Sequence, residues 1–297
     1  MQSFFERLTE AIEDKKNAVC VGLDPRIESM PKECQKHADL YGNLSRFCKG
    51  IVDIVAPIVP VIKPNAAFFE RYGMTGMDVL REIIRYAKNR GLLVILDGKR
   101  NDIGSTAEAY ADGILGQSSV WRADAMTVNP YLGEDSVEPF IKVAVERNAG
   151  IYVLVKTSNP GSAMIQDAVL KDTGKTVAHV VAEHVEKWSK KSGSAVGAVV
   201  GATFPQQLQE LRSLMPSAPF LVPGYGAQGG SAEDVEPAFT HAGAVVNNSR
   251  GIIYAWEKEP YKFRYGEEHW REAVMVATMD MVGDLGGAVQ NDEPSDW

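Results

Sequence analysis

The 297-residue sequence has few of the residues that build disulfide or metal frameworks. Its three cysteines, Cys20, Cys34 and Cys48, are odd in number and show no CxxC spacing. Its five histidines show no HxxxH pattern. We therefore expect no disulfide framework, no metal site and no cofactor, and the cysteine usage fits a reducing cytoplasm.

Long apolar runs and basic clusters are also missing. No run of 18 apolar residues occurs, and the first residues lack the basic start and apolar core of a signal peptide. The net charge of −8 is the opposite of the basic stripe that a nucleic-acid surface needs. We expect neither a membrane nor a nucleic-acid partner, and local groups would have to capture any anionic substrate.

Short apolar runs alternate with amphipathic segments along almost the whole chain. Eight strand–helix units in a chain of this length predict an α/β protein with a (β/α)8 TIM barrel, as a single domain. An open doubly wound sheet is the alternative, but no GxGxxG follows the first strand. The barrel should occupy residues 1–289, with an N-terminal helix, and an acidic tail at 290–297 should be disordered. The predicted strands are 18–23, 57–62, 92–96, 124–128, 150–155, 195–201, 220–222 and 244–247, and the predicted helices are 3–16, 43–56, 75–90, 105–117, 134–148, 175–191, 205–214, 232–240 and 267–282.

The third strand carries the most informative stretch. Five apolar residues, 92–96, are followed at once by Asp97, Gly98 and Lys99, and then by Asp102. Side chains two apart on a strand point the same way, so Asp97 and Lys99 should meet. An ammonium held among carboxylates stabilises a fold poorly, which favours a catalytic role, although a surface ion pair beyond a strand would show the same pattern.

Other polar residues follow the predicted strands, where the active site of such a barrel lies. Lys63 directly follows an apolar run, where a lysine has little reason to be present for structural purposes. Asn129 is more simply a helix cap or a loop residue. We expect the strand-end residues to converge on one mouth, and they are Asp24, Lys63, Asp97, Lys99, Asn129, Ser158, Pro223 and Arg250.

The loop at 223–230 is rich in residues with little or no side chain. Backbone amides in such a loop can approach an anion closely. Arg250, after the next strand, can bind phosphate oxygens in a bidentate manner. Because loops after strands seven and eight commonly bind phosphate in this architecture, the two features together predict a phosphorylated ligand.

Four motifs, in this order along the barrel, resemble the orotidine 5′-phosphate decarboxylase family in its long bacterial form (type 2). They are residues 22–25 (GLDP), 62–65 (IKPN), 97–107 (DGKRNDIGSTA) and 223–230 (PGYGAQGG), and the resemblance covers nearly the whole chain. It implies a cofactor-independent carboxy-lyase that converts orotidine 5′-monophosphate to UMP, the last step of de novo pyrimidine biosynthesis.

The resemblance also implies roles for the charged residues. Lys99 would donate the proton to C6 of the pyrimidine, and Asp97 and Asp102 would flank it in a network with Lys63. The long loop at 156–174 and the insert at 25–42 depart from compact members of the family. The substrate contacts implied by the family are Asp24 and Lys63 to ribose, Ser158 to the pyrimidine amide, Gln228 and Arg250 to phosphate with Pro223 beside them, and Asp102, Ile103 and Thr106 supplied to the neighbouring site of a homodimer.

The chemistry of the residues agrees with this reading. Loss of CO2 from C6 leaves a carbanion in the ring plane that the ring carbonyls delocalise poorly. A fixed ammonium beside C6 stabilises the charge as it develops and then delivers a proton. Neighbouring carboxylates would keep Lys99 protonated, and binding of the remote phosphate would help drive loop closure.

Three alternatives remain at the level of sequence. A metal-dependent sugar-phosphate decarboxylase or synthase shares the Asp-x-Lys-x-x-Asp pattern, but those relatives place a glutamate where this chain has Lys63, which would repel a cation. A Schiff-base aldolase acting through Lys99 needs a neutral amine, which adjacent carboxylates oppose. A catalytically silent nucleotide-binding barrel is the third.

Overall fold

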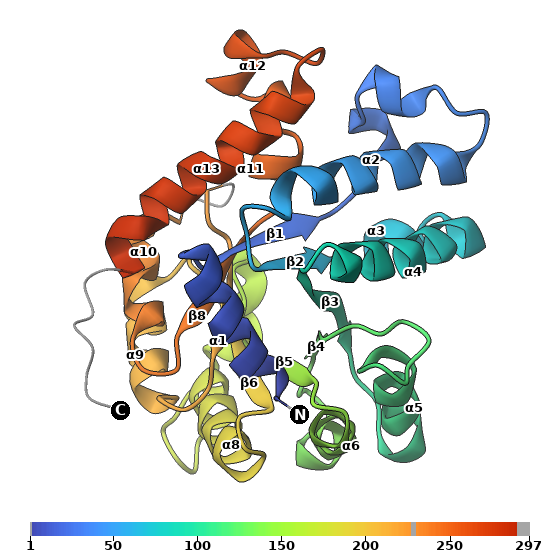
Figure 1. Cartoon of the computed structure of the whole chain (residues 1–297). Coiled ribbons are helices and arrows are strands. Elements are labelled where there is room, and N and C mark those ends of the chain that lie inside the picture. The colour runs from blue at the N-terminus through green and yellow to red at the C-terminus, as the bar shows by residue number, and fades with distance from the viewer. Residues whose placement is uncertain (1, 227–229, 290–297) are drawn as a thin grey trace.

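The computed structural model describes residues 2–226 and 230–289, and in these residues eight parallel strands form a closed barrel (Figure 1). The strands follow one another in chain order, and β8 returns to pair with β1 through Val19 and Val246. The predicted barrel is confirmed and the open sheet is excluded, while the expected tail at 290–297 lies outside the described residues. The strands are β1 (Val19–Leu23), β2 (Val61–Pro64), β3 (Leu93–Arg100), β4 (Ala125–Val128), β5 (Gly150–Lys156), β6 (Val196–Val200), β7 (Phe220–Pro223) and β8 (Ala244–Asn248).

Helices follow the strands and form the outer layer. No helix in the described part of the chain is long and apolar enough to cross a membrane. The α-helices are α1 (Phe4–Lys15), α2 (Leu40–Val55), α3 (Ala67–Glu70), α4 (Gly73–Asn89), α5 (Gly104–Ile114), α6 (Glu134–Glu146), α7 (Ala163–Gln166), α8 (Val177–Lys191), α9 (Pro205–Leu214), α10 (Ala232–Val235), α11 (Arg250–Ile253), α12 (Tyr261–Arg264) and α13 (Trp270–Val289). The 3-10 turns are η1 (Ile27–Ser29), η2 (Lys32–Gln35), η3 (Pro160–Ser162), η4 (Glu236–Phe239) and η5 (Ala255–Glu257).

Helix α1 closes the amino-terminal end of the barrel. Phe4 and Phe5 are buried there, and the Phe5 ring meets the Tyr152 ring edge-on with centroids 5.2 Å apart. A Cβ at position 150 would lie 2.4 Å from a Phe4 ring carbon, so Gly150 is what allows this close approach. Every strand contributes one residue to the same buried cluster, and these residues are Cys20, Val61, Ile95, Ala125, Tyr152, Val199, Leu221 and Val245.

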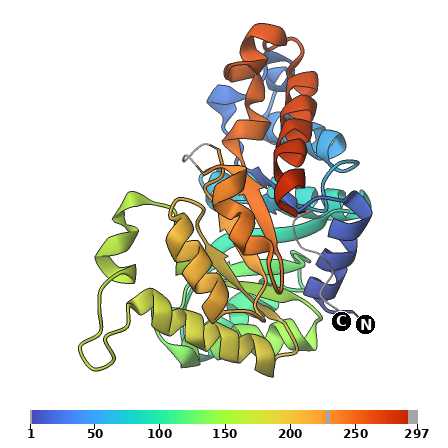
Figure 2. The same ribbon diagram turned by 90° about the vertical axis from the view of Figure 1, so that its left-hand side faces the viewer.

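An aromatic cluster joins α2 to the C-terminal elements, which lie side by side in Figure 2. The rings of Phe47 and Tyr254 stack at 5.6 Å, and Trp270 packs on Phe47 at 5.9 Å. The indole of Trp270 donates to Glu33 at 2.6 Å, and this bond ties the 25–42 insert to α13. The insert therefore belongs to the packed shell of the barrel.

Several predicted boundaries were wrong. The third strand extends past residue 96 to Arg100, because the backbone N–H groups of Gly98 and Lys99 donate to the side-chain hydroxyl oxygen of Thr127 on β4. Helix α2 starts at Leu40 because the Asp39 carboxylate caps it, accepting the Gly42 N–H at 2.7 Å. Residues 57–60 continue the turn after α2, so the second strand begins only at Val61.

The C-terminal region also differs from the prediction. The final helix does not end near Gly283 but continues through it, because the buried Met281 and Leu285 hold this stretch against the barrel. A helical glycine costs only about 1 kcal/mol relative to alanine, which such packing offsets. The predicted helix at 232–240 is divided into α10 and η4, and the segment 250–266, in which no helix was predicted, contains α11, η5 and α12.

Candidate active site

Two adjoining cavities open at the carboxyl-terminal ends of the strands. Their volumes are about 190 and 280 Å³, and Lys63, Asp97 and Pro223 line both. Seven of the eleven site residues predicted from sequence therefore lie around one hollow. The first cavity adds Asp24 and Arg250 to the shared three, and the second adds Lys99 and Ser158.

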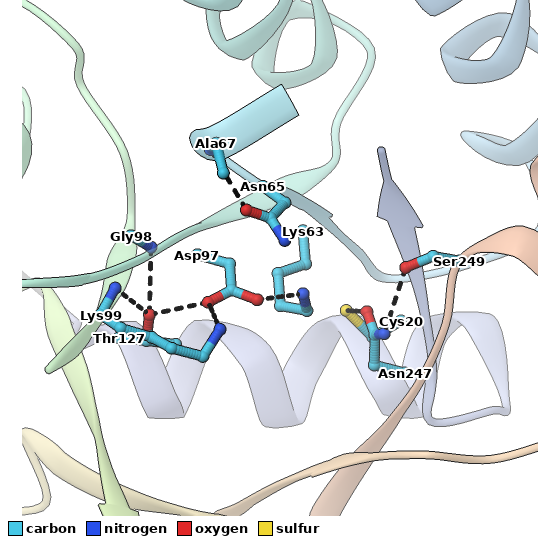
Figure 3. A network of polar contacts seen from close by, with 10 residues as sticks. All are labelled: Cys20, Lys63, Asn65, Ala67, Asp97, Gly98, Lys99, Thr127, Asn247 and Ser249. Carbon is cyan, nitrogen blue, oxygen red and sulfur yellow. Dashed lines mark hydrogen bonds and ion pairs between the residues drawn. The ribbon is translucent and has the colours of Figure 1, made fainter. Parts of the chain in front are cut away.

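Asp97 stands at the centre of this site, between two lysines (Figure 3). Its Oδ2 atom lies 2.6 Å from Lys63 Nζ, and its Oδ1 atom lies 2.6 Å from Lys99 Nζ. The side chains of Asp97 and Lys63 are 9 % and 5 % exposed, whereas that of Lys99 is 46 % exposed toward the second cavity. The network thus has two buried members and one member open to a ligand.

The charges of the buried pair support each other. Burial alone would raise the pKa of Asp97, but the Lys63 and Lys99 ammonium groups lower it well below its usual range. Burial would lower the pKa of Lys63, but Asp97 and Asp24 together raise it. Asp97 is therefore a carboxylate and Lys63 an ammonium at neutral pH, although both are removed from water.

Thr127, on β4, fixes the backbone beneath Lys99. Its Oγ1 atom accepts the N–H groups of Gly98 at 3.1 Å and Lys99 at 2.9 Å, and its hydroxyl donates to Asp97 Oδ1 at 3.0 Å. Lys99 has φ +45°, a conformation that non-glycine residues rarely adopt, so simple strand alternation does not explain how it meets Asp97. Such strain is typical of a site that the surrounding structure holds in place.

Asp24 lies at the other side of Lys63, at the end of β1. Burial raises its pKa, which Lys63 partly counteracts, and its Oδ1 atom is buried without a hydrogen-bond partner. The loop after β8 approaches closely here, since a Cβ on Gly22 would lie 1.8 Å from Ser249 Oγ. The free oxygen of Asp24 is suited to accept a hydrogen bond from a ligand hydroxyl.

The glycine-rich loop after β7 borders the first cavity. Gly224 and Gly226 have φ +100° and +67°, conformations that favour glycine, and Gly226 N–H donates to the Gly230 carbonyl at 2.9 Å. Arg250 is exposed at the start of α11 and lines the same cavity. Gln228, predicted to hold phosphate, lies outside the described residues.

Ser158 borders the second cavity, just after β5. Its carbonyl accepts the Thr203 hydroxyl at 3.2 Å. Gly201 packs directly against it, because a Cβ there would lie 2.9 Å from Ser158 Cα and N. Thr157 and Asn159 line the cavity beside it. Backbone contacts therefore hold this short segment against β6.

Three predicted residues are not brought to either cavity of this chain. Asp102 Oδ1 accepts the N–H of Ile103 at 2.8 Å, and the structure gives Asp102 no contact with Lys99. Ile103 is 56 % exposed, and Thr106 is exposed on the first turn of α5. Asp102 is partly buried just before α5, and Ile103 and Thr106 are exposed beside it.

Sequence reasoning missed several polar residues around the cavities. Thr127 lies two residues before Asn129, in a stretch that was predicted only as a buried strand. Its position near the end of that strand was the only indication in the sequence that it could belong to the site. Asn65 and Ser249 follow strands in the same way. Asn129 is a turn residue, as expected, since its Oδ1 accepts the Tyr131 N–H at 3.0 Å.

Comparison with known proteins gives consistent matches. Residues 17–259 match the model of the orotidine 5′-phosphate decarboxylase / HUMPS family. The chain is 50 % identical to the orotidine 5′-phosphate decarboxylase of Rhodopirellula baltica, over 97 % of this chain and 100 % of that one, and 41 % identical to that of Caldicellulosiruptor bescii, over 86 % and 91 %. The structure of Leishmania donovani OMP decarboxylase superposes with a TM-score of 0.75 at 31 % identity, covering 97 % and 99 % of the two chains.

Proposed function

Because this chain belongs to the orotidine 5′-phosphate decarboxylase family, we propose that it converts orotidine 5′-monophosphate to UMP and CO2 with its own side chains. It is a carbon–carbon lyase of pyrimidine biosynthesis. The observation that carries the proposed mechanism is the position of Asp97 between Lys63 and Lys99, with N–O distances of 2.6 Å on both sides, in the wall that two cavities share.

Lys99 is the proposed proton donor. The bond between C6 and the carboxylate breaks, CO2 leaves, and the electron pair stays on C6. The Lys99 ammonium, open to the second cavity, stabilises this charge as it develops and transfers a proton to C6, after which water returns a proton to the amine. Its fixed backbone supports this role, because a preorganised charge does not have to reorient during the reaction.

Asp97 and Lys63 are proposed to act by holding Lys99 in place and setting the charge around it. The lowered pKa of Asp97 keeps a carboxylate beside the Lys99 ammonium. Lys63 compensates the buried charge of Asp97, so that Lys99 is left available to the substrate. A substrate carboxylate placed near Asp97 would also be repelled by its negative charge.

The two cavities suggest how the nucleotide lies. The glycine-rich loop and Arg250 are suited to phosphate, with Gln228 expected beside them, and Asp24 is suited to a ribose hydroxyl. Pro223 borders both cavities, where ribose would meet the base, and Ser158 is placed to contact the pyrimidine amide. The nucleotide would thus run from the first cavity into the second.

Asp102, Ile103 and Thr106 are proposed to complete the site of a second copy. They border the rim near Lys99 without lining a cavity of their own chain, and Ile103 exposes an apolar side chain. A homodimer with shared sites would cover this surface. Sedimentation analysis of wild type and Ile103→Asp would test the assembly.

The metal-dependent alternative is not favoured by the donor set. Both carboxylate oxygens of Asp97 already contact ammonium groups, and Lys63 occupies the place where a cation would have to be held. The proposed function is tested by following the ultraviolet absorbance of orotidine 5′-monophosphate with EDTA present. Turnover that persists supports the proposal, turnover abolished by EDTA favours the metal-dependent enzyme, and tight UMP binding without turnover favours a silent binding protein.

A further inference from the structure

Lys156, the last residue of β5, is a fully buried lysine that lines neither cavity. Its Nζ atom lies 2.6 Å from Asp167 Oδ1 and 5.0 Å from the centre of the Phe204 ring. The lysine side chain is 1 % exposed and that of Asp167 is 32 % exposed. A charge this deeply buried requires its partner, because a lone ammonium would lack both water and a counter-ion.

Asp167 belongs to the segment 157–176, which carries η3 and α7 and projects from the side of the barrel in Figure 2. Gln207 of α9 also donates to Asp167 Oδ1, at 3.2 Å. The neighbouring Gln166 binds back to Thr157 twice, accepting its N–H at 2.9 Å and donating to its hydroxyl at 2.8 Å. The ion pair therefore ties the returning part of the segment to the strand end from which it departs.

Ser158 lies between these anchored points. Lys156 precedes it by two residues, Thr157 is bound by Gln166, and the Ser158 carbonyl is held by Thr203. The side of Ser158 toward β6 is fixed by contact with Gly201. On its other side, the backbone before Ser158 is held by the Lys156–Asp167 ion pair and by the Gln166–Thr157 hydrogen bonds. Loss of the ion pair would let this part of the backbone move.

We propose that the Lys156–Asp167 ion pair is a positioning device that fixes Ser158 toward the base-binding end of the site. This inference rests on the proposed function, in which Ser158 contacts the pyrimidine. Both residues act through Ser158 and neither touches substrate. A buried ion pair contributes little net stability compared with apolar residues of similar size. What this pair supplies, and apolar packing would not, is a fixed position for the backbone next to Ser158.

The test compares Asp167→Asn and Lys156→Met with wild type, using ligands with and without a base. Both variants should bind UMP roughly tenfold more weakly and lose roughly ten- to hundredfold in kcat/KM, since small displacements of a positioning group have effects of this size. Ribose 5-phosphate, which lacks the base, should bind within about twofold of wild type, because the phosphate contacts are elsewhere. Glu183→Gln, which removes the exposed Lys175–Glu183 pair of the same region, is the matched control and should change neither.

A double-mutant cycle with Ser158→Ala separates the proposals. If Asp167 acts through Ser158, Asp167→Asn should have little further effect on UMP binding in the Ser158→Ala background. An equal effect in both backgrounds, or equal weakening of ribose 5-phosphate, would overturn the positioning role. If Ser158→Ala alone leaves UMP binding and kcat unchanged, the proposed base contact fails first. Failure of both ion-pair variants to fold by circular dichroism would assign the pair to stability and likewise overturn the inference.

Discussion

The hydroxyl of Thr127 holds Lys99 from below, accepting its backbone N–H at 2.9 Å while donating to Asp97 at 3.0 Å. One side chain thus sets the backbone of the proposed proton donor and the orientation of its carboxylate partner. We expect Thr127→Val, which has almost the same shape, to lower kcat by roughly ten- to hundredfold with little change in KM. It should also lower the free energy of unfolding by about 1–3 kcal/mol, because two partly buried N–H groups lose their acceptor.

Thr127→Ser keeps the hydroxyl and is the matched control. It should retain most of the wild-type kcat in the same absorbance assay, with a modest loss of stability from the missing methyl group. If the valine and serine variants were equally impaired, packing and not hydrogen bonding would be the function of Thr127.

Lys99→Ala should reduce turnover by several orders of magnitude, because no other ammonium in the described residues has comparable access to the second cavity. The fold should remain, since the Lys99 side chain is 46 % exposed, and circular dichroism would verify this. Lys142→Ala removes an exposed lysine from α6 and serves as control. Near-normal turnover in Lys99→Ala would rule out the proposed mechanism.

Arg250→Ala should raise KM for orotidine 5′-monophosphate, by roughly ten- to hundredfold if a charge-assisted phosphate contact of about 1.5–3 kcal/mol is lost. Turnover of orotidine, which has no phosphate, should be far less affected. Steady-state kinetics on both compounds distinguish a phosphate contact from general damage to the site, and an unchanged KM for the nucleotide would contradict the assignment.

The lowered pKa of Asp97 predicts a specific dependence of stability on pH. A carboxyl whose pKa is lower in the folded state stabilises the fold fully above its unfolded value of about 4, and this contribution declines as pH falls toward the folded value. Asp97→Asn should destabilise the protein at pH 7 by about 3–5 kcal/mol, because the buried Lys63 loses the carboxylate with which it is directly paired.

Urea unfolding of wild type and Asp97→Asn at a series of pH values measures this contribution. The difference between the two proteins should be largest near neutrality and become smaller below about pH 4. A difference that stayed constant down to pH 2 would mean that protonation of Asp97 is not linked to unfolding.

The barrel could be predicted because the period of the apolar residues and the order of the strands are local properties of the sequence. The strand-end rule placed Lys63, Asp97 and Ser158 correctly around one hollow. The path of β3 through Gly98 and Lys99 could not be predicted in this way. It depends on Thr127, a residue about 28 positions along the chain that reads locally as one more strand residue.

Long-range packing also explains the other errors. The segment 250–266 lacks a clear period, and its short helices form because Tyr254 and Trp256 join the cluster around Phe47 and Trp270. The ion pair between Lys156 and Asp167 could not be predicted either, because nothing in the local sequence around one residue indicates that it pairs with the other. Domain bounds at residue 289 and the state of the following tail stay predictions.

The aromatic residues of α1 determine which end of the barrel is open to a ligand. Phe4 and Phe5 pack against Tyr152 at the amino-terminal end of the barrel, so the rings of α1 cover the core on the side opposite the two cavities. This packing leaves the carboxyl-terminal ends of the strands, where Lys63, Asp97 and Pro223 line both cavities, as the face on which the proposed reaction takes place.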